Sequence, residues 1–169
     1  RSHTFVMYEM GHYGTTTNRG RFSTKDGTVQ VDASGRSGKV DIVMDMSSIN
    51  TGVDLLNRHV QSKDFFNVAD FPTARFVAER LVFDGDRVTE VPGTLTLMGQ
   101  TRPVTLKASR FNCYMSPVLN RQVCGGDFEG RPFHLHESQQ FRIGSLFGWK
   151  WKETGLRRFR RMYDEEGKG

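Results

Sequence analysis

The two cysteines of this 169-residue chain are the side chains with the widest choice of chemistry. Cys113 and Cys124 could form a disulfide across one loop, stay as reduced thiols, or join His134 and His136 in a zinc site. The long gap between the cysteines and the His-x-His arrangement depart from the usual spacing of zinc ligands. The zinc site therefore has the least support of the three.

Arg58 and His59 are the next candidates, because neighbouring cationic and imidazole groups can bind anionic oxygens. An arginine offers a bidentate pair of donors, so the two residues could hold a pyrophosphate or carboxylate headgroup at one end of a binding cavity. In the plainer alternative, Arg58 is solvated and His59 forms a hydrogen bond with the adjoining loop.

Signatures of catalysis are missing from the sequence. It has no glycine-rich phosphate loop, nucleophile elbow, HExxH motif or recognisable pair of carboxylates. Asp64, Asp70 and Glu79 are scattered, and His59 is the only plausible general base. The sequence therefore predicts a protein that is not an enzyme and that carries no cofactor and no metal.

Short segments of alternating apolar and polar residues must position these groups. The clearest segment is residues 39–46, in which four apolar residues share one face: Val40, Ile42, Met44 and Met46. Lys25-Asp26-Gly27 and Asp84-Gly85-Asp86 predict hairpin turns between such segments. Strands joined by glycine-containing turns indicate an all-β sandwich or barrel.

Residues 47–76 form the one long interruption among the strands. Three apolar residues recur there at helical spacing: Val53, Leu56 and Val60. Asn50 or Thr51 could cap this short helix, and one side of it should be buried. A single helix favours a barrel, because it could plug or cover one end.

The alternation also predicts which side chains face the interior of the sheet. The candidates, which would form either a packed core or the wall of an apolar tunnel, are Phe5, Met7, Phe22, Val40, Ile42, Met44, Phe76, Phe83, Leu95, Leu97 and Leu106. An eight-stranded barrel can be filled by side chains or can hold one small ligand, so the residues alone leave both outcomes open.

Charge is distributed unevenly along the chain. The formal net charge is +5, but residues 131–169 hold nine Lys and Arg against five acids, which leaves 15 against 14 for residues 1–130. The body is nearly neutral, so we predict no nucleic-acid partner. No apolar run approaches the length of a membrane-spanning helix.

Several motifs occur in the order found in one known family. They are His3-Thr4-Phe5-Val6, Arg19-Gly20-Arg21-Phe22, Ser48-Ile49-Asn50-Thr51-Gly52, His59 with Ser62-Lys63-Asp64-Phe65-Phe66, Phe71-Pro72-Thr73, Gly93-Thr94-Leu95-Thr96-Leu97 and Gly99-Gln100-Thr101-Arg102-Pro103-Val104. With these, residues 3–128 resemble the YceI-like family of polyisoprenoid-binding, lipocalin-like proteins.

The resemblance implies an antiparallel lipocalin-like β-barrel with an elongated apolar interior that binds a long isoprenoid or similar lipid. It also implies an exported protein, periplasmic or secreted, and the chain begins at Arg1-Ser2-His3 without a signal peptide, as a mature chain would. In an exported chain, Cys113 and Cys124 are expected to form the disulfide.

The resemblance weakens from Gly130 onward, where the apolar alternation is lost. We therefore expect a barrel domain over residues 1–130 and a divergent basic segment over residues 131–169, which could complete the barrel in part. Such a tail could come from divergence or from a shifted reading frame. If the barrel stays open, its unpaired edge could pair with a second copy as a homodimer.

Three functions compete at this stage. The leading hypothesis is non-catalytic binding, sequestration or transport of a long-chain isoprenoid or similar amphiphilic lipid in the barrel. The alternatives are a structural or interaction barrel with a filled core, and an enzyme that acts on a barrel-bound lipid or haem-like substrate with His59 as its base.

Overall fold

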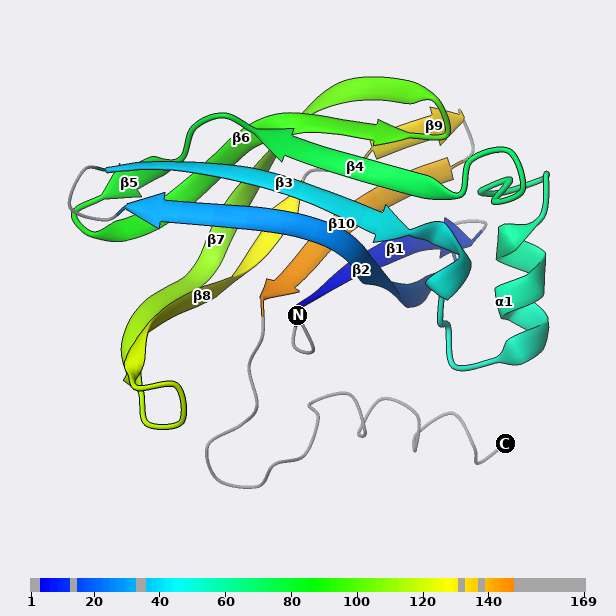
Figure 1. Cartoon of the computed structure of the whole chain (residues 1–169). Helices are drawn as coiled ribbons and strands as arrows, with labels where there is room; N and C mark the ends of the chain where they lie inside the picture. Colours follow the sequence, from blue (N-terminus) through cyan, green and yellow to red (C-terminus); the bar gives the residue numbers. More distant parts are fainter. Residues whose placement is uncertain (1–3, 13–14, 33–35, 131–132, 137–138, 148–169) are drawn as a thin grey trace.

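In the part of the chain that the structure describes, the protein is an antiparallel β-barrel with one short α-helix at one end (Figure 1). The computed structural model describes residues 4–12, 15–32, 36–130, 133–136 and 139–147, and for Thr4, Thr24, Lys25 and residues 133–147 it describes the backbone alone. The strands are β1 (Thr4–His12), β2 (Thr16–Asp32), β3 (Ser37–Asp45), β4 (Thr73–Ala78), β5 (Val82–Asp84), β6 (Arg87–Leu97), β7 (Gln100–Ser116), β8 (Arg121–Gly130), β9 (Phe133–His136) and β10 (Gln139–Phe147).

Strand pairing closes the sheet on itself. The order is β1-β2-β3-β4-β6-β7-β8-β10, and β10 pairs with β1 as well as with β8. These pairings join eight antiparallel strands in a ring, while β5 pairs with β6 and β9 pairs with β10 outside it. The predicted all-β barrel is confirmed.

Closure of the ring depends on the segment in which the sequence pattern fails. Strand β10 lies within residues 131–169, and its pairing with β1 runs from Thr4 opposite Phe147 to Met10 opposite Phe141. Ladder hydrogen bonds come from backbone groups, so a strand can pair without a regular apolar pattern. Through β10, the segment therefore completes the barrel in part. The edge of β1, which could have paired with a second copy of the chain, pairs with β10 instead. The homodimer remains a prediction.

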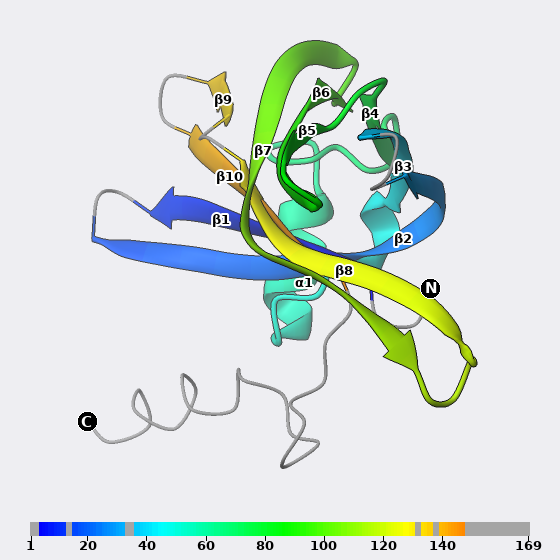
Figure 2. The same cartoon turned by 90° about the vertical axis from the view of Figure 1, so that its left-hand side faces the viewer.

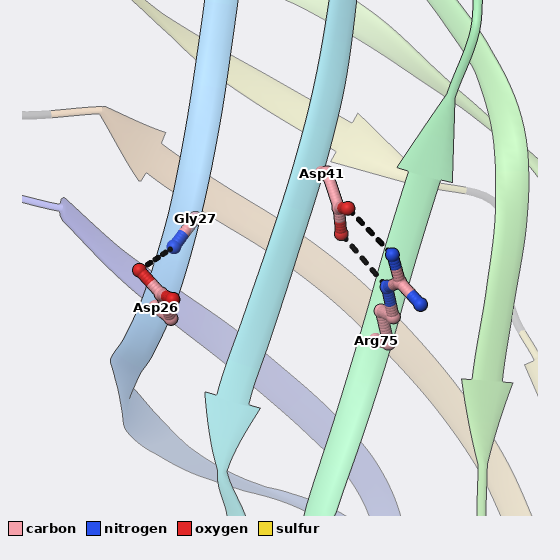
Figure 3. A network of polar contacts seen from close by, with 4 residues as sticks. All are labelled: Asp26, Gly27, Asp41 and Arg75. Atoms are coloured by element: carbon pink, nitrogen blue, oxygen red, sulfur yellow. Dashed lines mark hydrogen bonds and ion pairs between the residues drawn. The ribbon is translucent and has the colours of Figure 1, made fainter.

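The hairpin turn predicted at Lys25-Asp26-Gly27 is wrong, because β2 continues through these residues as one strand. The register shifts between Thr24 and Asp26, which is a β-bulge, and Gly27 then lies opposite Ile42 of β3. Asp26 accepts a hydrogen bond from the Gly27 amide at 2.8 Å (Figure 3). A Cβ atom on Gly27 would lie 2.8 Å from the Asp41 carbonyl oxygen, so the glycine allows a close approach rather than a turn.

An ion pair joins β3 and β4 on the outer face of the barrel. Arg75 donates two hydrogen bonds to the Asp41 carboxylate, from Nε at 2.8 Å and from Nη2 at 2.6 Å (Figure 3). These hydrogen bonds hold the pKa of Asp41 below its usual range. Both side chains are exposed, so the pair fixes the neighbouring strands only weakly.

The interruption between β3 and β4 contains a 3-10 turn, η1 (Met46–Ser48), and the helix α1 (Asp54–Gln61). The predicted caps are wrong, because α1 begins after Val53, which makes no side-chain cap. Thr51 instead donates from Oγ1 to the Asn57 side chain at 2.8 Å and so folds the loop that enters the helix. No helix in the described ranges is long and apolar enough to cross a membrane.

The residues of β1 that face inward differ by one position from the predicted ones. Val6, Tyr8 and Met10 are buried, whereas Phe5 and Met7 lie on the other face and are half-buried. Phe5 packs outside the barrel, where the Arg21 guanidinium lies 5.0 Å from the centre of its ring. Because side chains alternate along a strand, a shift of one residue exchanges the entire inward set.

Candidate ligand-binding site

The two ends of the barrel differ in what covers them. At one, the helix end, α1 follows the end of β3 and packs under the barrel through Val60. At the other, the open end, the last residues of β2 lie near the β5–β6 hairpin, and the β7–β8 hairpin projects beyond them (Figures 1 and 2). The helix covers one end of the barrel, so the two ends offer a ligand different surroundings.

Aromatic side chains seal the helix end. The Tyr8, Phe22 and Phe66 rings form a triangle with centroids 5.3 to 5.6 Å apart, and the Phe66 ring meets both others edge-on. All three are buried together with Val60 of α1. Edge-to-face packing of buried rings stabilises the fold and leaves little space between α1 and the interior.

Tyr8 lies at the centre of this seal. Its side chain has no exposed surface, and burial raises its pKa to about 12. Gly20 lies opposite on β2, where a Cβ atom would be 2.5 Å from the ring of Tyr8. The glycine thus creates the space that lets β1 turn this large side chain inward.

A pocket of about 880 Å³ occupies the open end. Its lining residues come from β2, the β5–β6 turn, β6, β7 and β8, and they are Val31, Asp32, Asp86, Arg87, Phe111, Asn112, Cys113 and Gln122. Strands β2 and β7 stand four places apart in the eight-stranded ring, so the pocket spans the opening from side to side. Its volume falls within the range of about 300–1,000 Å³ typical of ligand sites.

The long β7–β8 hairpin builds one wall of this pocket. Cys113 and Cys124 lie opposite one another in the ladder and form a disulfide, as predicted. Behind it, the register shifts between Ala108 and Arg110, and a Cβ atom on Gly126 would be 2.3 Å from the Arg110 carbonyl oxygen. The bulge and the glycine bend the hairpin, while the disulfide keeps its two strands together.

Polar and apolar groups are divided within the pocket. Phe111 is buried in the same cluster as the core residues and meets the Phe128 ring edge-on at 6.5 Å, so the pocket borders the core there. Two carboxylates, Asp32 and Asp86, oppose a single cation, Arg87. The pocket can therefore receive an apolar chain at its floor and a polar group at its rim, with an electrostatic balance unfavourable to a strongly anionic group.

Most of the predicted inward residues lie in the core of the barrel. Eight are buried, namely Phe22, Val40, Ile42, Met44, Phe76, Leu95, Leu97 and Leu106, and Phe83 is half-buried against them. Phe5 and Met7 are the two whose predicted inward face is wrong. Contact of any of these residues with a ligand remains a prediction.

Arg58 and His59 lie on the exposed side of α1, at the end of the barrel away from the pocket. The His59 ring packs edge-on against Phe65 at 4.7 Å, which is a local contact with the loop after the helix. Neither residue lines the pocket. Their role in binding a headgroup remains a prediction.

The zinc alternative for the cysteines is wrong, because both sulfur atoms are bonded to one another. Within the part of the chain that the structure describes, no three His, Cys, Asp or Glu residues form a group able to hold a metal. The His134 and His136 side chains, and the basic residues from 148 onward, lie outside the described side chains.

Sequence reasoning missed all of the pocket residues except Cys113. Asp86 lies in a correctly predicted turn and Arg87 follows it, and Asn112 and Gln122 lie close to the cysteines in the sequence, but polar residues in and beside hairpin turns are common. The available signal was the absence of glycine between Gln100 and Ser116, over which β7 runs for 17 residues and reaches the pocket with Phe111 and Asn112.

These features define a lipocalin-like barrel, a closed antiparallel sheet with one covered end and a pocket at the other. The model of the YceI-like domain matches residues 1–149, and the chain belongs to this family. Protein YceI from Salmonella arizonae is 36% identical over 107 residues, which cover 63% of this chain and 56% of that protein. The chain thus spans about half the length of the curated relatives it matches.

Solved structures share the fold at low sequence identity. BcnA from Burkholderia cenocepacia aligns with a TM-score of 0.59 and 18% identity over 85% of this chain and 95% of its own. A polyisoprenoid binding domain from Saccharophagus degradans aligns with a TM-score of 0.52 and 13% identity over 86% and 93%. At these identities the likeness shows the fold alone.

Proposed function

We propose that this protein binds a long-chain isoprenoid or a similar amphiphilic lipid without catalysis. The observation that carries the proposal is the pocket of about 880 Å³ at the open end of a barrel whose other end is sealed. Support also comes from membership of the YceI-like family and from the polyisoprenoid binding domain among the structural neighbours. Sequestration or transport would follow from reversible binding.

In this proposal the apolar chain lies against Val31 and Phe111 and extends toward the aliphatic core, which contains Leu95 and Leu106. Burial of each methylene group contributes about 0.8 kcal/mol, so a long chain can be held without covalent chemistry. The methionines of the core, Met10 and Met44, can adapt to an irregular chain.

The polar end of the ligand would lie at the rim, where Arg87, Asn112 and Gln122 offer hydrogen-bond donors. Because Asp32 and Asp86 lie at the same rim, we propose a neutral headgroup, such as a hydroxyl or carbonyl, rather than a pyrophosphate. His59 lies at the other end of the barrel, so an enzyme that used it as a base could not act on this site.

An oxidising compartment is part of the proposal. Disulfides persist mainly outside the cytoplasm, and the Cys113–Cys124 bond supports a periplasmic or secreted location. The same bond shapes the pocket wall, so binding should weaken where it is reduced.

Native mass spectrometry of the protein with a polyprenol tests the proposal. We expect a single adduct that is lost on denaturation, and Arg87→Gln should weaken it about five- to tenfold because a charged donor is removed. Arg58→Gln, at the helix end, is the matched control and should leave the adduct unchanged. If Arg58→Gln weakened the adduct and Arg87→Gln did not, the headgroup would lie at Arg58. The absence of any adduct would favour the structural barrel.

A polyprenyl phosphate of the same chain length tests the headgroup. It should bind more weakly than the alcohol, and Asp32→Asn with Asp86→Asn should reduce that difference, because both substitutions remove negative charge from the rim. Tighter binding of the phosphate to the unmodified protein would contradict the proposed neutral headgroup while leaving lipid binding intact.

A further inference from the structure

The tip of the β7–β8 hairpin carries large apolar side chains that nothing in the described structure covers. Val118 is 88% exposed, Met115 66% and Leu119 54%, and Tyr114 beside them is also exposed. Four of the seven large exposed hydrophobic residues in the described ranges thus lie on one hairpin. The hairpin projects beyond the barrel (Figures 1 and 2), so its tip is convex and accessible.

Local hydrogen bonds hold the tip in this shape. Ser116 is buried, its hydroxyl accepts a hydrogen bond from the Leu119 amide at 3.2 Å, and its carbonyl accepts one from the Asn120 amide at 2.9 Å. The Cys113–Cys124 disulfide joins the strands behind the turn. Because the tip is already ordered, it loses little conformational entropy when it binds or enters a lipid bilayer. These contacts therefore favour insertion.

The charges around the tip favour an anionic surface. Residues 108–126 contain two arginines, Arg110 and Arg121, and no acidic residue. Both arginines are exposed. Apolar side chains flanked by arginine and tyrosine are typical of segments that lie at the interface of anionic bilayers.

A convex tip of this size fits a bilayer better than a protein partner. Stable protein interfaces bury about 800 Å² on each side, which a single turn and its two flanks do not supply. Elsewhere on the rim, Asp32, Asp84 and Asp86 would be repelled by anionic lipid, so the hairpin should make the first contact.

We propose that the β7–β8 hairpin inserts its tip into the interfacial region of an anionic lipid bilayer and holds the open end at the membrane surface. The base of the same hairpin supplies Phe111, Asn112, Cys113 and Gln122 to the pocket wall. Insertion of the tip therefore places the pocket beside the bilayer, where the lipid of the proposed function would be exchanged. That exchange rests on the proposed function; the docking itself does not.

Flotation with vesicles tests the docking. Vesicles of phosphatidylethanolamine and phosphatidylglycerol should carry the protein upward, and Val118→Asp with Leu119→Asp should lower the partition coefficient at least about tenfold. Leu55→Asp is the matched control, because Leu55 is 71% exposed on α1 at the opposite end, and it should float like the unmodified protein. Val118→Ser with Leu119→Ser, which leaves the charge unchanged, should also lose binding.

Three results would overturn the proposal: the unmodified protein fails to float, the tip variants float as well as it does, or Leu55→Asp reduces flotation as much as they do. A change from dimer to monomer in the tip variants, measured by light scattering without vesicles, would assign the tip to a second copy of the chain instead and would equally overturn it.

Loading with a polyprenol in detergent solution separates this proposal from the proposed function. The tip variants should load as the unmodified protein does, because Val118 and Leu119 do not line the pocket, and normal loading also shows that they are folded. Flotation without loading would refute lipid binding and keep the docking, whereas loading without flotation would refute the docking alone.

Discussion

The helix end and the open end of this barrel are built from the same strands but from different kinds of side chain. At the helix end, Tyr8, Phe22 and Phe66 are buried in mutual contact beneath α1. At the open end, charged and amide side chains surround a pocket with Phe111 on its wall. Buried aromatic contacts are therefore concentrated at the sealed end, and in the proposed function the other end is the one that binds.

The largest expected effect is the loss of a ring from the seal. Phe66→Ala should lower the free energy of unfolding by about 3–5 kcal/mol, because it removes a buried ring that touches two others. Urea denaturation followed by circular dichroism measures this, with Leu119→Ala at the exposed tip as the control, expected to change stability by less than about 0.5 kcal/mol. Equal losses of stability for Phe66→Ala and Leu119→Ala would contradict the difference between the two ends.

Loss of the disulfide should be the next largest effect and should act on the open end. Cys113→Ser with Cys124→Ser should cost about 2–3 kcal/mol, because the bond closes a short loop in the unfolded chain. A reducing agent should destabilise the unmodified protein by the same amount and leave the double variant unchanged. If reduction left the free energy of unfolding of the unmodified protein unchanged, the disulfide would contribute nothing to the stability of the fold.

Alkaline pH should loosen the sealed end through Tyr8. Its pKa in the folded protein, about 12, exceeds the value near 10 of an exposed tyrosine, so the unfolded state loses its proton first as the pH rises. The stability is thus complete below pH 10 and should fall by up to about 2–3 kcal/mol between pH 10 and 12.

Tyr8→Phe removes this alkaline loss and tests its source. The variant should show a flatter dependence of stability on pH above 10 than the unmodified protein, whereas Tyr114→Phe at the hairpin should keep the loss because it leaves Tyr8 in place. Parallel pH profiles for Tyr8→Phe and the unmodified protein would show that Tyr8 ionises without opening the seal.

The smallest effect is expected between the two ends, on the outer face. Asp41→Asn should reduce stability less than Phe66→Ala, the loss of the disulfide or the ionisation of Tyr8, because its ion pair with Arg75 is exposed to solvent. The pKa of Asp41 is lowered, so the contribution is present at neutral pH and is lost as the pH falls through that lowered value. A double-mutant cycle with Arg75→Gln measures it, and a coupling as large as the effect of Phe66→Ala would contradict this ranking.

The sequence predicted the sealed core better than the open site. The regular alternation of β3 correctly placed Val40, Ile42 and Met44 inside. In β1, both faces carry apolar residues, so alternation alone could not choose between them, and the space left by Gly20 for the Tyr8 ring is visible only across the strand pair. An Asp-Gly pair likewise suits a turn or a bulge, and the neighbouring strand decides between them.

The pocket could not be predicted from the sequence because it depends on how the sheet curves. Val31 and Phe111 are 80 positions apart, and they share a pocket because the sheet curls until β2 and β7 face one another across the ring. The pairing of β10 relies on backbone groups that the side-chain pattern of residues 139–147 does not reveal. In the sequence, the polar residues that line the pocket therefore resembled those of ordinary solvated turns.

The most direct test of the account asks at which end the ligand lies. A polyprenol that carries a photoreactive diazirine on its chain can be bound, irradiated and located by mass spectrometry of the digested protein. We expect label in peptides that contain Val31 and Phe111, with none in residues 54–66 of the helix end. Label concentrated in residues 54–66, or no label at saturating ligand, would contradict it.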